Sequence, residues 1–89
     1  MREKKIRKVL HERPLIRIGK AGITEGLLSE VGRQLRIKGL VKVKVLRSFL
    51  RSYNRGTEDV AAEVARATEA EVIDVRGHVF VLRRVKKAG

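Results

Sequence analysis

Hydrophobic and polar residues alternate or recur at characteristic spacings along this chain, and the spacings predict its elements. Residues 40–46 show the most regular alternation, with three valines separated by two lysines, which is typical of a strand with one buried face. Short apolar runs at residues 15–18, 72–75 and 79–82 predict three further strands. The last two runs are separated by an Arg-Gly-His sequence, which favours an antiparallel hairpin.

The segment after the first strand has apolar residues at helical spacing and clear signals at both ends. Thr24 suits an N-cap, and Gly39 suits the left-handed residue that follows a helix. Gly26 and Gly32 each cost about 1 kcal/mol relative to alanine inside a helix. We therefore expect a close backbone approach to compensate, and at Gly32 specifically a packing contact. The predicted apolar stripe comprises Leu27, Leu28, Val31 and Leu35.

Two more helices are predicted, together with one segment that the pattern does not assign. Residues 2–12 indicate a basic helix that ends before Pro14. Another helix is expected to begin with Thr57 as its N-cap, followed by acidic residues in its first turn. Residues 47–56 either prolong the preceding strand or form a mobile loop. Within that segment we expect Phe49 in the core, whereas packing and base stacking are equally compatible with Tyr53.

The element order predicts the fold class. Helices alternate with strands and a final strand pair follows, which indicates crossover connections and a mixed sheet. We expect one compact α/β domain over residues 1–89, arranged α-β-α-β-α-β-β around four strands. Its 89 residues with 43% apolar content suffice for one core. The absence of cysteine excludes disulfides and thiolate metal sites.

The charge of the chain indicates its class of partner. The formal net charge is +12, and the basic residues are unevenly distributed. Residues 1–56 contain 16 basic and 4 acidic residues, whereas residues 57–89 contain 6 of each. A heat-adapted surface usually raises both signs together. An excess of one sign on one part of a small domain favours a polyanionic partner, which here means nucleic acid. The acidic helix after residue 57 is expected to lie away from that partner.

The sequence Gly19-Lys20-Ala21-Gly22 is the main candidate site, since it joins a predicted strand to a helix N-terminus. Glycines let a backbone come close to a partner, and the lysine and the helix start both favour a phosphate. We expect neighbouring basic side chains and Tyr53 to extend the contact. Arg33 and Arg36 are included because they lie outside the apolar stripe of their helix. The candidate RNA-binding residues are Gly19, Lys20, Ala21, Gly22, Arg33, Arg36, Lys42, Lys44, Arg51, Tyr53 and Arg55.

The run from Ile18 to Gly26, followed by Gly39 and the alternating strand, resembles the CRM domain (chloroplast RNA splicing and ribosome maturation). The similarity is to its small stand-alone YhbY-like members and extends over nearly the whole chain. It implies a fold like the C-terminal domain of translation initiation factor 3 and binding to precursors of large-subunit ribosomal RNA. It also implies that the family's loop function falls on residues 19–22. Residues 47–56 are more basic and more aromatic than the family pattern.

Other functions are weighed against this one. A KH domain also uses Gly-x-x-Gly, but between two helices, whereas here a strand precedes the loop. The alternative is an architectural DNA-binding chromatin protein, which would bind duplex DNA, as a dimer. His11 and His78 are expected to be surface residues, so we expect no enzyme activity, metal, cofactor or small-molecule substrate. We also expect a cytoplasmic monomer without a signal peptide or membrane contact.

Overall fold

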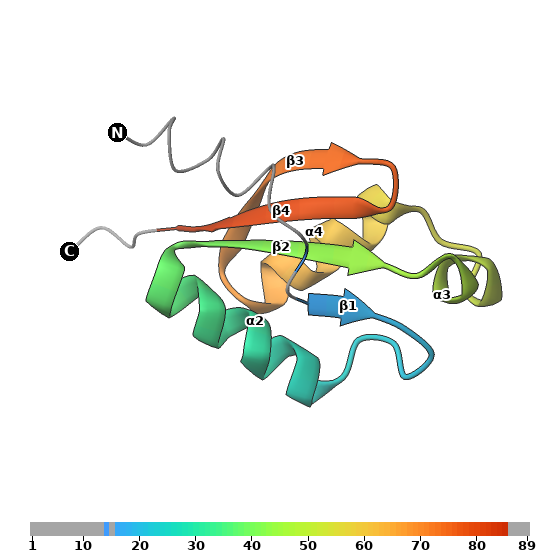
Figure 1. Ribbon diagram of the computed structural model, residues 1–89, viewed down its shortest axis with the longest axis horizontal. Coiled ribbons are helices and arrows are strands. Elements are labelled where there is room, and N and C mark those ends of the chain that lie inside the picture. The colour runs from blue at the N-terminus through green and yellow to red at the C-terminus, as the bar shows by residue number, and fades with distance from the viewer. Residues whose placement is uncertain (1–13, 15, 86–89) are drawn as a thin grey trace.

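The computed structural model describes residue 14 and residues 16–85 (Figure 1). The expected helix at residues 2–12, the start of the first strand at Leu15, and the basic tail that begins at Lys86 lie outside the described residues. Three helices and four strands are observed. In chain order they are β1 (Ile16–Ile18), α2 (Glu25–Lys38), β2 (Leu40–Val45), α3 (Arg47–Ser52), α4 (Thr57–Ala67), β3 (Ala70–Arg76) and β4 (Val79–Arg84).

The four strands form one mixed sheet in the order β1-β2-β4-β3. β1 pairs with β2 in parallel, and β4 is antiparallel to both β2 and β3. The predicted α/β class, the four-stranded mixed sheet and the antiparallel hairpin are therefore confirmed. The register places Arg17 opposite Lys44 and Lys42 opposite Val81, so these four side chains share one face of the sheet.

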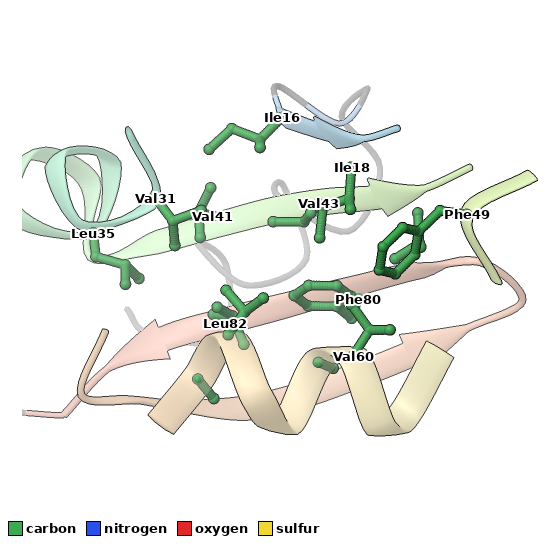
Figure 2. Packing of buried hydrophobic residues seen from close by; sticks show 14 of the residues in the cluster. Ile16, Ile18, Val31, Leu35, Val41, Val43, Phe49, Val60, Phe80 and Leu82 are labelled. Atoms are coloured by element: carbon green, nitrogen blue, oxygen red, sulfur yellow. The ribbon is translucent and has the colours of Figure 1, made fainter. Parts of the chain in front are cut away.

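The opposite face of the sheet forms the core, and both long helices cover it. Val41, Val43 and Val45 of β2 are all at most 1% exposed and belong to the same cluster as residues of α2 and α4. Figure 2 shows Phe80 and Leu82 of β4 in the middle of this cluster, with residues of β2 and α4 around them. The alternation in β2 thus buries the valines, as predicted, and turns the two lysines away from the core.

Helix α2 has the predicted ends. The hydroxyl of Thr24 accepts a hydrogen bond from the N–H of Leu27 at 3.1 Å, and Gly39 is left-handed with φ of 78°. The predicted packing contact at Gly32 is wrong. A Cβ at Gly32 would meet only a guanidinium nitrogen of Arg36 at 3.8 Å, because this part of the helix faces away from the sheet.

Two other expectations need correction. Residues 47–52 form the short helix α3, neither a longer strand nor a loop, and it turns Phe49 and Leu50 into the core. Six residues are too few for helical periodicity to be visible in the sequence.

Thr57 is not the N-cap of α4: Gly56 holds that position, and Thr57 is the first helical residue. Thr57 is buried because it shares the inward face of the helix with Val60 and Val64.

Candidate nucleic-acid interface

The sequence Gly19-Lys20-Ala21-Gly22 forms a tight turn between β1 and α2. The N–H of Gly22 donates to the carbonyl of Gly19 at 2.8 Å, and Gly22 is left-handed with φ of 72°. Lys20 and Ala21 are exposed at the tip. Within the described residues, the N–H groups of these two residues donate no hydrogen bond. The tip therefore presents a cation and two unused backbone donors to solvent, which is the arrangement that binds an anion.

The turn packs directly on the segment that contains α3. The N–H of Leu46 donates to the carbonyl of Ile18 at 2.8 Å, which joins the end of β1 to the start of α3. A Cβ on Gly19 would lie 3.1 Å from a methyl group of Leu46, and one on Gly22 would lie 2.9 Å from the Phe49 ring. A side chain at position 22 would therefore clash with the Phe49 ring and strain the left-handed backbone, whereas at position 19 the Leu46 side chain would have to shift by a few tenths of an ångström. Figure 1 shows the turn and α3 at the same end of the sheet.

Helix α3 adds basic and aromatic groups beside the turn. Arg47 and Arg51 are exposed on consecutive turns of this helix, and neither forms an ion pair within the described part of the chain. Tyr53, at the end of the helix, is 60% exposed. Its ring centroid lies 4.9 Å from that of Phe49, the core residue that also lies beside Gly22. Tyr53 thus packs against Phe49 on one side and remains largely exposed to solvent on the other.

The strand lysines lie on the sheet face that is opposite the core. Lys44 is exposed and pairs in register with the exposed Arg17 of β1, while Lys42 is half-buried. Arg17 was not among the sequence candidates. The available signal was the alternation Ile16-Arg17-Ile18, which turns the arginine outward when both isoleucines are buried.

The arginines of α2 lie elsewhere, because α2 covers the core face of the sheet. Arg33 forms a 3.3 Å ion pair with Glu30, and Arg36 is exposed near the end of the helix. The structure therefore does not bring Arg33 and Arg36 together with Lys42 and Lys44.

Arg55 is held by two carboxylates of α4. Its guanidinium lies 2.8 Å from Asp59 and 2.7 Å from Glu63, and its side chain is 22% exposed. The hydrogen bond with Asp59 raises the pKa of the Arg55 guanidinium, and the same bond lowers the pKa of Asp59. The charge of Arg55 is thus balanced inside the protein, unlike the charges of Lys20, Arg47 and Arg51.

No group of three or more histidine, aspartate or glutamate side chains within the described residues could hold a metal ion. No helix in this part of the chain is both long enough and apolar enough to cross a membrane.

Residues 2–84 of the chain match the CRS1 / YhbY (CRM) domain family. A protein of Methanocaldococcus jannaschii named "Probable RNA-binding protein" is 39% identical over 80 residues, which are 90% of this chain and 58% of that protein. The chain therefore spans less than two thirds of the length of this relative. An "RNA-binding protein" of Haemophilus influenzae is 33% identical over 75 residues, covering 83% of this chain and 71% of that protein.

A solved structure is similar along almost the whole chain. The solution structure of a hypothetical protein from Staphylococcus aureus, described as a candidate RNA-binding protein, superposes with a TM-score of 0.71 at 26% identity. The match covers 97% of this chain and 85% of the staphylococcal one. The observed arrangement of helices and strands is thus shared with a protein of known structure.

Proposed function

The chain belongs to the CRS1 / YhbY (CRM) domain family, and we propose that it binds RNA by holding the phosphate backbone at the turn of residues 19–22. One observation carries the proposal. The turn exposes the side chain of Lys20 together with two backbone N–H groups that have no other hydrogen-bond acceptor in the described structure. Backbone donors and a lysine at one point hold a phosphate without regard to base sequence. The names of the relatives support RNA as the polymer.

Basic groups around the turn would extend the contact along the RNA chain. Arg47 and Arg51 of α3 lie on one side, and Arg17 and Lys44 follow on the sheet face. The exposed ring of Tyr53 offers a surface on which an unpaired base stacks, a contact worth about 1 to 3 kcal/mol per base. We assign Arg55 a structural role, because its charge is already balanced by Asp59 and Glu63.

The remaining candidates have secondary places in this proposal. Lys42 lies next to Lys44 on the sheet face, half-buried, and Arg33 and Arg36 would meet only an RNA that passes around β1 to the α2 side. The proposed RNA is large-subunit ribosomal RNA or its precursor, in line with the family resemblance, and the proposed role is non-enzymatic.

The proposal is tested by comparing wild type with Lys20→Gln. Binding to a large-subunit ribosomal RNA fragment and to duplex DNA of equal length is measured over a salt series. Arg66→Gln is the matched control, because Arg66 is an exposed cation in the last turn of α4. We expect a preference for RNA, weaker binding by Lys20→Gln, and a salt slope reduced by about 1. Equal loss in both variants, or equal binding of both polymers, would contradict the proposed site.

A further inference from the structure

A groove lies at the same end of the sheet as the 19–22 turn. It is bounded by α3, the start of α4 and the turn that joins β3 to β4. The N–H of Val45 donates to the carbonyl of His78 at 2.7 Å, which holds that turn against the end of β2. No residue of the 19–22 turn lines this groove. Its walls are formed by Arg47, Leu50, Arg51, Asn54, Arg55, Gly56, Thr57, Gly77 and His78.

The groove is positively charged. Arg47 and Arg51 project from consecutive turns of α3, and neither forms an ion pair within residues 16–85. His78 is half-buried on the opposite wall. The nearest carboxylates, Glu58 and Asp59, line a neighbouring hollow, and Asp59 is bound to Arg55. That hollow shares Gly56, Thr57 and Gly77 with the groove, and in the described structure Arg47 and Arg51 form no ion pair with its carboxylates.

Thr57 supplies an independent sign that a ligand belongs there. It is only 8% exposed, it lines the groove, and no hydrogen bond of its hydroxyl is found within the described residues. Within the described residues, Gln34 Oε1 is the side-chain atom that is closed off from solvent without a partner, so the Thr57 hydroxyl is still reached by solvent. It is therefore open to an external partner that enters the groove. The start of α4 also lacks a side-chain cap, because Gly56 is the N-cap. Its first N–H groups therefore remain available to an anion.

We propose that this groove binds a phosphate group through the Thr57 hydroxyl, the first N–H groups of α4, and the guanidinium groups of Arg47 and Arg51. The inference rests on the proposed function for the source of the phosphate, which is the backbone of the RNA held at the 19–22 turn. Free phosphate has the same chemistry and is the other source. Since α3 packs against the turn and also lines the groove, one RNA strand would cross α3 from the first site to the second.

The experiment follows backbone N–H signals of the ¹⁵N-labelled full chain by NMR. One titration uses inorganic phosphate and a second uses a single-stranded RNA oligonucleotide. We expect both to shift the signals of residues 56–58 and His78, and we expect Thr57→Val to weaken phosphate binding by about tenfold. Thr68→Val is the matched control, since Thr68 lies at the other end of α4 and its hydroxyl already donates to Val64 at 2.8 Å. Thr57→Ser keeps the hydroxyl and should bind phosphate as wild type does.

The outcomes separate the two proposals. RNA that shifts residues 19–22 but not residues 56–58, with no response of the groove to phosphate, overturns the groove and leaves the proposed function in place. Inorganic phosphate that shifts residues 56–58 while RNA shifts neither region supports the phosphate site, names free phosphate as its source, and overturns the proposed function. Unchanged phosphate affinity in Thr57→Val overturns the groove, whatever happens at the turn.

Discussion

The two halves of this small domain use their basic residues differently. In the half that contains the 19–22 turn and α3, Lys20, Arg47 and Arg51 form no ion pair within the described residues. In the half formed by α4, β3 and β4, ion pairs join Arg55 to Asp59 and Glu63, Arg76 to Asp74, and Arg83 to Glu71. Net charge alone therefore does not locate a binding surface. In the proposed function, the cations that matter are those near the 19–22 turn that form no ion pair within the described residues.

The largest expected effect is on stability, and it concerns the packing of the 19–22 turn on α3. We call the half that contains this turn and α3 the unpaired half. Gly22→Ala places a Cβ 2.9 Å from the Phe49 ring at a left-handed φ, so we expect the free energy of unfolding to fall by about 2 to 4 kcal/mol. Urea denaturation measures the change. Gly77→Ala is the control, because Gly77 is also left-handed but has open space around it, and its expected loss is about 1 kcal/mol. Equal losses at both glycines would refute the packing of the turn on α3.

The next effect concerns the aromatic group of the unpaired half. Tyr53→Leu should weaken binding of single-stranded RNA by about 1 to 3 kcal/mol through loss of one stacked base. Tyr53→Phe keeps the ring and should bind nearly as wild type, which isothermal titration calorimetry would show. Equal weakening in both variants would assign the contribution to the hydroxyl group instead of the ring.

A direct comparison of the halves uses two double variants. Arg17→Gln with Lys44→Gln removes two unpaired cations, so the salt slope of RNA binding should fall by about 2. Arg76→Gln with Arg83→Gln removes two paired cations and should leave that slope unchanged. Filter binding over a salt series distinguishes them. Similar slopes in the two double variants would mean that pairing does not decide which cations bind RNA.

The smallest effect concerns the paired half and depends on pH. Arg55 holds the pKa of Asp59 below its ordinary value of 3.8, so the ion pair stabilises the fold above that value and is lost as pH falls through the lowered pKa. Asp59→Asn should therefore lower the melting temperature slightly at neutral pH, and by progressively less as the pH falls through the lowered pKa. The same substitution in an Arg55→Gln background is the control and should show a much smaller difference, because the ion pair is already absent. A deficit in Asp59→Asn that persists in acid would contradict the ion-pair explanation.

The features that could be predicted are those that depend on residues close together in the sequence. The ends of α2 follow from Thr24 and Gly39, and the burial of β2 follows from strict alternation. The glycine pair at residues 19 and 22 was recognised as a turn, but its packing partners, Leu46 and Phe49, come from a helix too short to be detected.

Other features of the site depend on tertiary contacts that no local pattern records. The pairing of Arg55 with Glu63 requires the chain to turn into α4 at Gly56. The separation of Arg33 from Lys44 follows from α2 covering only one face of the sheet, which the spacing of residues within each element does not determine.

The position of β4 has a consequence for how the chain is made. β4 is the last strand of the described residues, yet it lies inside the sheet, between β2 and β3. While a ribosome is still synthesising the chain, β2 has no antiparallel neighbour until residues 79–84 emerge from the exit tunnel. The hairpin of β3 and β4 is local and can form first, but its pairing with β2 spans about 40 residues and is the slower step. Completion of the sheet is therefore a late step in biosynthesis that follows formation of the hairpin.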